Sequence, residues 1–324
     1  MNRAKRRGEP GRSRGSAWRL GLAAIATGLL AAACSDSVPT SPATAAPEGV
    51  RAARATSIYS FQTIAVDGAR LTAANGINAG GEIVGYYVDS DYAYHGFLWR
   101  DGTFTSIDYP GADGTDVRGI GPGGEIVGTY WLAGEPAAAY HGFRMSKQGE
   151  FTAVSYPGHT YMIAQRVLPD GAILGCRHDT DLSSTMRGVT LSKKGNEEVS
   201  LYASMNNGAT PDLKHVVGMY RNQAANRTEA YTIDNGVITP FFFAGSTMTN
   251  AWDVNASGQI VGVYQNTSGI YGYVLTNRDF ASVVTLNVPG ASATRAFGIN
   301  SRGDVVGSFT LANKTYGFLA RAGR

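Results

Sequence analysis

The chain is poor in the residues that bind metals and form disulfides. Its 324 residues include only two cysteines, Cys34 and Cys176, and five histidines. Neither residue type has a partner at the H-x-x-x-H or C-x-x-C spacing of a local zinc site. The segment from Asp89 to Asp91 is too short for a calcium loop and lacks the glycine and terminal glutamate of an EF-hand. We therefore expect no metal and no cofactor.

Long apolar runs and a dominant charge are also missing. Leu20–Ala33 holds 14 uncharged, largely apolar residues, which is too short to span a bilayer comfortably. The formal net charge is +3, but the first 33 residues hold 7 of the 28 Lys+Arg and 1 of the 25 Asp+Glu. The remainder carries 21 basic and 24 acidic residues, with no basic stripe, so we expect no nucleic-acid partner. The G-x-S-x-G elbow and phosphate-binding glycine loops are absent too.

The chain does contain a repeat of about 45 residues. A glycine preceded by two apolar residues, as in the I-V-G step, recurs six times at spacings of 43, 47, 43, 44 and 45 residues. These anchor glycines are Gly85, Gly128, Gly175, Gly218, Gly262 and Gly307. A small residue followed by an apolar one, Gly96-Phe97 in the first copy, keeps step with them. Periods in the forties with many glycines and aromatic residues are typical of β-propeller blades.

Each copy predicts four β-strands. Thr115–Ile120 and Glu125–Tyr130 are the first two strands of the second copy, and Tyr94–Trp99 and Thr103–Tyr109 are the last two of the first. The sixth copy ends before a fourth strand, whereas Ser57–Ala69 resembles a fourth strand without a copy. We therefore predict an all-β fold, a six-bladed β-propeller whose ring is closed by the N-terminal strand completing the last blade. A β-solenoid or two packed sheets are the alternatives.

The start of the chain predicts export. Residues 1–33 have the basic and apolar regions of a signal peptide, and "LLAAAC" resembles a bacterial lipobox with Cys34 as the lipidated residue. Cleavage at an A-x-A site that leaves Cys34 unmodified is the alternative, and the residues after Arg6-Arg7 do not support twin-arginine export. Residues 34–56 predict a disordered tether, and residues 57–324 the propeller. We expect a monomeric lipoprotein, membrane-anchored through Cys34 and facing the periplasm or the cell exterior.

The repeat resembles that of a known family. The segments "GINAGGEIVGYY" and "YHGFLWRDG" are similar to the HAF-repeat extracellular proteins of bacteria, which are named for a His-Ala-Phe step. Here His95-Gly96-Phe97 and His141-Gly142-Phe143 correspond to that step. The resemblance covers Ser57–Arg324. It implies an exported, propeller-like repeat protein and no established activity, so no catalytic residue is carried over.

The first strand of each copy should lie nearest the propeller axis. The residue eleven before the anchor glycine is small or apolar and suits packing between blades. The residue ten before it varies among Asn75, Arg118, Gln165, Trp252 and Phe297, and these side chains can line or plug the channel. The first strand of the fourth copy is hard to place. The loops between second and third strands vary in length, so we take their face as the candidate binding face.

Candidate ligand-binding residues follow from these positions. Asp116, Asn250 and Arg295 sit beside repeated threonines near the variable face. The complete candidate set is Asp116, Arg118, Asn250, Trp252, Arg295, His178, Asp179 and Asp181. The last three belong to the segment "RHDTD", for which we expect a solvated loop, with a metal or acid–base site as the alternative. The residue that opens each third strand, such as His95 or His141, is either a recognition group or simply a strand residue.

Three functions remain open. The first is a binding or interaction module at the cell envelope, with a glycan, a peptide or an envelope protein as partner. The second is a propeller hydrolase or lyase acting on a sugar or lactone, for which Asp116 and the loop from His178 to Asp181 are the only groups expected to converge. The third is a purely structural envelope module. Fold alone cannot choose among them.

Overall fold

A computed structural model describes residues 59–323. This part of the chain consists of β-strands and turns, with one short helix, α2 (Leu182–Thr185), and one 3₁₀ turn, η1 (Phe280–Ser282). Within these residues no helix has the length and apolar character needed to cross a membrane. The expected signal peptide (1–33), Cys34 and the tether (34–56) lie outside the described residues. The all-β prediction is confirmed.

The strands pair as six four-stranded antiparallel units, one for each copy of the repeat. Unit 1 contains β2 (Leu71–Ile77), β3 (Ile83–Val88), β4 (Tyr94–Arg100) and β5 (Thr103–Ile107). Unit 2 contains β6 (Gly114–Ile120), β7 (Ile126–Trp131), β8 (His141–Met145) and β9 (Phe151–Val154). Unit 3 contains β10 (Tyr161–Val167), β11 (Ile173–His178), β12 (Arg187–Ser192) and β13 (Gly195–Glu198).

The other three units repeat this order. Unit 4 contains β14 (Met205–Ala209), β15 (His215–Asn222), β16 (Arg227–Asp234) and β17 (Val237–Phe241). Unit 5 contains β18 (Met248–Val254), β19 (Ile260–Asn266), β20 (Gly269–Leu275) and β21 (Val284–Leu286). Unit 6 contains β22 (Ala293–Ile299), β23 (Val305–Leu311), β24 (Lys314–Ala322) and β1 (Tyr59–Ile64). The first strand of copy four, which its sequence left unplaced, is therefore β14.

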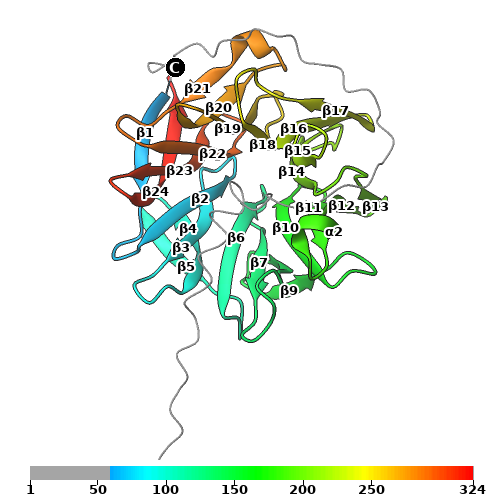
Figure 1. Cartoon of the computed structure of the whole chain (residues 1–324). Helices are drawn as coiled ribbons and strands as arrows, with labels where there is room; N and C mark the ends of the chain where they lie inside the picture. The colour runs from blue at the N-terminus through cyan, green and yellow to red at the C-terminus, as the bar shows by residue number, and fades with distance from the viewer. Residues whose placement is uncertain (1–58, 324) are drawn as a thin grey trace, which may run out of the picture. The chain divides into compact units, whose positions relative to one another are not determined.

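The N-terminal strand completes unit 6. β1 pairs antiparallel with β24 from Tyr59–Ala322 to Ile64–Gly317, so the blue and red ends of the described chain lie together in Figure 1. A single parallel bridge between Leu71 and Thr315 then links β24 to β2 of unit 1. The prediction that the N-terminal strand supplies the fourth strand of the last copy is confirmed.

The anchor glycine of each copy is explained by a close backbone approach. A Cβ atom at Gly85 would lie 1.9 Å from the carbonyl oxygen of Ala73, and one at Gly307 would lie 1.8 Å from that of Arg295. The other four anchor glycines meet the same obstacle, at 1.8–2.3 Å. Only glycine lets the second strand approach the first this closely, which is why the I-V-G step marks the repeat.

The repeated threonines fasten the connection between units. Thr115 Oγ1 accepts a hydrogen bond of 2.9 Å from the backbone N–H of Tyr109, six residues earlier. Thr72, Thr249 and Thr294 accept the equivalent bond. In unit 4 the aligned residue is Ser204, which accepts from the N–H of Gly188 instead. These side chains thereby tie the start of the first strand to the preceding connection in units 1, 2, 5 and 6 and to unit 3 in unit 4.

Every first strand contains a β-bulge at the same place. The register to the second strand shifts by one residue there, which inserts one extra residue in each of the six units. The inserted residues are Asn75, Arg118, Gln165, Asn207, Trp252 and Phe297. Each first strand also contacts the first strand of the next unit, and β22 contacts β2. The bulges of all six units are therefore brought towards one region.

Candidate functional site

The candidate site is built on these bulges. We call the six bulge residues, together with the three polar residues two positions before a bulge, the first-strand cluster. Its members are Asn75, Asp116, Arg118, Gln165, Asn207, Asn250, Trp252, Arg295 and Phe297. Bulges often re-aim side chains beside functional sites, because the extra residue breaks the regular alternation of the strand.

Arg166, the residue after the bulge in unit 3, shows that the bulges converge. Its Nη1 donates to the carbonyl oxygens of Arg118, at 2.7 Å, and Gln165, at 2.9 Å. Its Nη2 donates to those of Asn75, at 3.1 Å, and Phe297, at 2.5 Å. One guanidinium therefore reaches the bulge carbonyls of units 1, 2, 3 and 6. Those four bulges must lie within a few Å of a common point.

Arg166 is paired across the cluster with Asp253 of unit 5. Its Nε lies 3.4 Å from Asp253 Oδ2, which also accepts a hydrogen bond from the N–H of Ile299 in unit 6. Burial raises the pKa of Asp253, and Arg166 opposes that shift. The other four copies have glycine at this position. A positive and a negative residue in place of glycine are the sequence signal that could have pointed to this ion pair. Our sequence reasoning missed both residues.

Asp116, Arg118 and Asn75 form a buried polar group between units 1 and 2. Asp116 is 1% exposed, and its Oδ2 lies 2.7 Å from Arg118 Nη2. Asn75 Nδ2 donates to Asp116 Oδ1 at 3.1 Å and to the carbonyl oxygen of Val117 at 2.8 Å. Burial raises the pKa of Asp116 to about 6, although Arg118 and Asn75 favour the charged form. This carboxyl group thus titrates close to neutral pH.

Arg295 brings a third guanidinium to the same region, after Arg118 and Arg166. Burial and the Asp116 carboxylate raise the pKa of Tyr86, on β3, and Arg118 and Arg295 partly offset that rise. Asp116, Arg118 and Arg295 therefore all act electrostatically on the Tyr86 phenol. Burial lowers the pKa of Arg295 itself. In the described part of the chain no carboxylate forms an ion pair with Arg295.

Six polar atoms of the first-strand cluster are buried and have no hydrogen-bond partner. They are Arg118 Nε, Gln165 Oε1, Asn207 Oδ1, Asn250 Oδ1, Trp252 Nε1 and Arg295 Nε. More than nine in ten buried polar groups in proteins are hydrogen-bonded, so each exception needs an explanation. Six exceptions gathered on five of the six first strands indicate a place where water or a ligand supplies the missing partners.

The structure thus places five of the predicted site residues in one cluster. Asp116, Arg118, Asn250, Trp252 and Arg295 all belong to it, and Trp252 packs edge-on against Phe297 with 5.2 Å between ring centroids. Asn207 was missed because the first strand of the fourth copy could not be aligned. Its Nδ2 donates to the carbonyl oxygen of Ala251 at 2.7 Å, which ties unit 4 to unit 5.

The remaining predicted residues, at the end of β11, lie among different neighbours. The prediction that His178 lies in a solvated loop is wrong, because this residue is the last of β11 and is 0% exposed. Its ring stacks on Tyr161, 5.6 Å between centroids, and burial lowers its pKa. Asp179 faces His159 at 3.3 Å, and Asp181 accepts from Ser184 Oγ at the start of α2. These partners differ from those of Asp116.

The residue that opens the third strand has a structural role. In four units its ring packs on a ring of the second strand, two residues after the anchor glycine. The packed pairs are Tyr87–His95, Tyr130–His141, Tyr264–Tyr271 and Phe309–Tyr316, with centroids 5.0–5.4 Å apart. Cross-strand ring pairs of this kind stabilise a sheet. These residues therefore have a packing role in the sheet, whether they are histidine or tyrosine.

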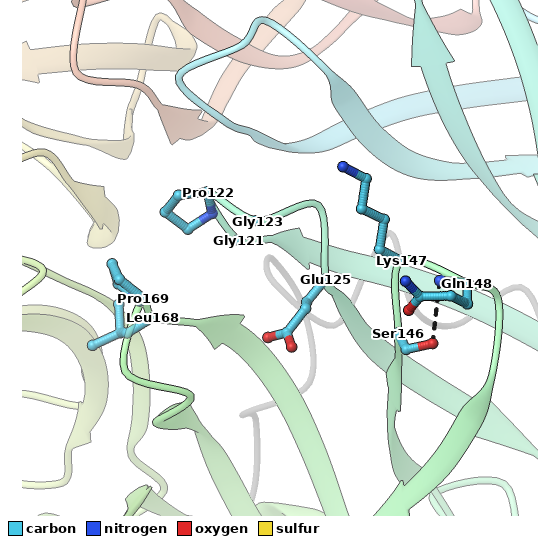
Figure 2. Close-up of a pocket in the computed structure, with 9 residues that line it drawn as sticks. All are labelled: Gly121, Pro122, Gly123, Glu125, Ser146, Lys147, Gln148, Leu168 and Pro169. Atoms are coloured by element: carbon cyan, nitrogen blue, oxygen red, sulfur yellow. Dashed lines mark hydrogen bonds between the residues drawn. The ribbon is translucent and has the colours of Figure 1, made fainter.

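A pocket of about 260 Å³ lies between units 2 and 3, on the face of the short turns and not on the face expected from sequence. Figure 2 shows it bordered by the turn at Gly121, by residues 146–148 and by Leu168. Units 1, 5 and 6 carry asparagine where unit 2 has Gly121, and Asn255 Nδ2 donates to the carbonyl oxygen of Asn300 in the next unit at 3.0 Å. Gly121 has no side chain that could make this bond to unit 3, and the pocket lies beside it.

A metal site finds no support in the described residues. No group of three or more His, Cys, Asp or Glu side chains among them lies close enough together to hold a metal ion. Cys176, on β11, is 0% exposed, and burial raises the pKa of its thiol to about 12, so it behaves as a small apolar residue.

No family model matches the chain, and no curated protein matches it. Many solved structures are similar to it, and three of them are described below. A protein of unknown function from Dyadobacter fermentans is 13% identical, with a TM-score of 0.53, over 81% of this chain and 98% of that one. A gluconolactonase from Xanthomonas campestris is 14% identical, with a TM-score of 0.52, over 89% and 99%.

The third is the β-propeller domain of the Trilobed protease from Pyrococcus furiosus. It is 8% identical, with a TM-score of 0.50, over 79% of this chain and 96% of that one. At such low identity the likeness shows the fold alone, which is that of a β-propeller. It does not carry an activity across.

Proposed function

We propose that this chain is an exported, ligand-binding β-propeller of the cell envelope, and that its first-strand cluster is the binding site. The ligand is a small, polar, glycan-like molecule that enters from the face of the variable loops. The observation that carries the proposal is the set of six buried polar atoms without partners. A binding module needs a convergent polar platform, and these atoms supply one.

The proposal includes a closed ring of six blades. Two features support closure: β1 completes the unit formed by the end of the chain, and β22 contacts β2. A Cβ at Gly298 of unit 6 would lie 3.2 Å from Gly76 Cα of unit 1, so the two first strands approach closely. Closure removes unpaired sheet edges, which suits a protein exposed outside the cell.

The proposal also includes the resemblance to the HAF-repeat proteins and a lipid anchor at Cys34. The sequence "LLAAAC" at the end of an apolar run supports acylation of this cysteine. An anchor followed by the tether 34–56 would hold the propeller at the outer surface of a membrane. The partners implied are the lipid bilayer and a glycan or envelope protein.

The test of ligand binding is the thermal unfolding of the purified chain in the presence of mono- and oligosaccharides. A ligand at about 100 times its dissociation constant adds roughly 2.7 kcal/mol of apparent stability. Trp252→Phe leaves an aromatic ring that can pack on Phe297 and removes the unpartnered indole N–H. Trp99→Phe, a buried tryptophan outside the cluster, is the matched control. We expect the ligand shift to shrink in the first variant only, and a panel without any shift would refute the proposal.

A hydrolase or lyase acting on a sugar or lactone is the second candidate. One observation favours it: Asp116 is a buried carboxyl group whose pKa is raised to about 6, beside a guanidinium. A group that titrates near neutral pH suits general acid–base catalysis. Turnover of sugar lactones that is lost in Asp116→Asn would support the enzyme. Binding without turnover would favour the binding module. Neither binding nor turnover would favour a structural role.

A further inference from the structure

The charges of the first-strand cluster do not balance. Arg118 is paired with Asp116 at 2.7 Å, and Arg166 with Asp253 at 3.4 Å. Arg295 is the third guanidinium, and among residues 59–323 no carboxylate pairs with it. The region therefore carries one uncompensated positive charge. A half-buried cation without a counter-charge is costly, so this position favours an anionic group from outside the protein.

The unpartnered atoms also define which hydrogen bonds a ligand must make. Arg118 Nε, Trp252 Nε1 and Arg295 Nε are donors, and two of them belong to cations. The amide oxygens of Gln165, Asn207 and Asn250 are acceptors. A ligand that fills this set must accept near the arginines and donate to the amides. Hydroxyl groups both donate and accept, so they suit an amide in either orientation.

Other small ligands fit this pattern less well. A neutral sugar supplies the hydroxyl groups but leaves Arg295 without a counter-charge. A simple fatty acid or an inorganic anion at full charge supplies acceptors but no donors for the three amide oxygens. An amino acid brings an ammonium group into a region of positive charge, where both carboxylates, Asp116 and Asp253, are already paired.

We infer that the first-strand cluster binds a polyhydroxylated monocarboxylate, a sugar acid of the uronate or aldonate class, with its carboxylate against Arg295 and its hydroxyl groups against the amides of Gln165, Asn207 and Asn250. This inference rests on the proposed function, because it names the ligand of the same cluster. It adds a charge requirement that the binding of a neutral glycan does not have.

The test is isothermal titration calorimetry of the purified chain with matched probes. D-glucuronate and D-gluconate carry both features, D-glucose and D-sorbitol lack the carboxylate, and hexanoate lacks the hydroxyl groups. Arg295→Gln removes the uncompensated charge, and Arg321→Gln makes the same change at an exposed arginine outside the cluster. We expect both sugar acids to bind at least tenfold more tightly than the neutral pair and hexanoate. Arg295→Gln should weaken them at least tenfold, whereas Arg321→Gln should not.

Each contrary outcome is distinct. Equal binding of D-sorbitol and D-gluconate overturns the inference and leaves the proposed function standing. Equal binding of hexanoate shows an anion site that does not recognise hydroxyl groups, which also overturns it. No heat with any probe counts against both the inference and the proposed function. The melting temperature of Arg295→Gln verifies that it folds, and Trp252→Phe provides a second variant if it does not.

Discussion

The guanidinium of Arg166 and the carboxylate of Asp253 join units 3 and 5, with 3.4 Å between Nε and Oδ2. Both residues stand where four other copies have glycine. At two of these, Gly119 and Gly208, an added Cβ would lie within 2.6 Å of an atom of the next unit. One ion pair thus lies between the first strands, beside bulge side chains that keep unpartnered polar atoms. In our proposal the ion pair serves stability and the neighbouring bulge residues serve binding.

The first prediction concerns this pair. Arg166→Gly removes four hydrogen bonds to backbone carbonyls and leaves Asp253 buried without a counter-charge. We expect a loss of about 3–5 kcal/mol in the free energy of unfolding, measured by chemical denaturation. The double variant with Asp253→Gly should recover part of that loss, because the unpaired charge is gone. A double variant no more stable than the single one would contradict the role given to the pair.

The second prediction concerns Asp116 and pH. Burial raises its pKa from 3.8 to about 6, while Arg118 and Asn75 favour its charged form and Tyr86 and Tyr94 lie close by. The folded chain therefore holds this proton more tightly than the unfolded chain, and the contribution of Asp116 to stability falls as pH rises from about 4 to about 6. Two pKa units correspond to roughly 3 kcal/mol.

The measurement is the free energy of unfolding of wild type and Asp116→Asn at several pH values. Relative to the variant, the wild type should lose stability across that window. Asp67→Asn, at an exposed aspartate, is the control and should follow the wild type. Parallel curves for wild type and Asp116→Asn would show that this carboxyl group is not buried in the way described.

The third prediction separates binding groups from structural ones. Gln165 is 1% exposed and its Oε1 has no partner, so Gln165→Met should raise the stability of the free protein by about 1 kcal/mol. The same variant should lose the ligand-induced stabilisation. Asn206→Leu is the comparison, because Asn206 bonds to Thr190 and Tyr231 and its loss should cost about 1–3 kcal/mol. Destabilisation of both variants would mean that Gln165 is also a structural group.

The fourth prediction concerns the pocket of Figure 2. Asn255 closes its own turn by accepting from the N–H of Gln259 and reaches the carbonyl oxygen of Asn300 in the next unit. Gly121→Asn should allow the same two bonds in unit 2, with the carbonyl oxygen of Leu168 as the acceptor in unit 3. It should add about 0.5–1.5 kcal/mol to the free energy of unfolding. The melting temperature should rise accordingly, and Asn255→Gly should lower it. A lower melting temperature in Gly121→Asn would show that the pocket cannot accommodate an asparagine side chain in this way.

The fifth prediction concerns the anchor. If Cys34 is acylated, Cys34→Ala should move the chain from the membrane fraction to the soluble fraction of the exporting cells. Mass spectrometry of the N-terminal peptide should find the lipid in the wild type alone. An unmodified Cys34 in the wild type would favour ordinary cleavage at the A-x-A site.

The strands were predictable because the same local contacts recur from unit to unit and require the same residue types. The close approach at Gly85 and its equivalents leaves a mark in every copy, and the threonine bond at the start of the first strand leaves one in units 1, 2, 5 and 6. Unit 4 escaped because β14 combines an altered anchor alignment with Ser204 in place of the threonine. These two changes together hid that strand.

The candidate site was predictable only in part. Position within the repeat identified Asp116, Arg118 and Arg295, since equivalent residues of a repeat occupy equivalent places. Arg166 and Asp253 stand out from four glycines at the equivalent positions, but their pairing could not be predicted, because the two residues lie 87 positions apart in the chain. His178 was mistaken for a loop residue because its burial comes from neighbouring aromatic rings, which leave no local pattern.

The most direct test of the binding site is a crystal structure of the chain soaked with D-glucuronate. The account predicts that the carboxylate of the sugar lies within hydrogen-bond distance of Arg295 and that its hydroxyl groups meet the amide oxygens of Gln165, Asn207 or Asn250. Ordered waters that satisfy all of these atoms, with the sugar elsewhere or absent, would contradict it.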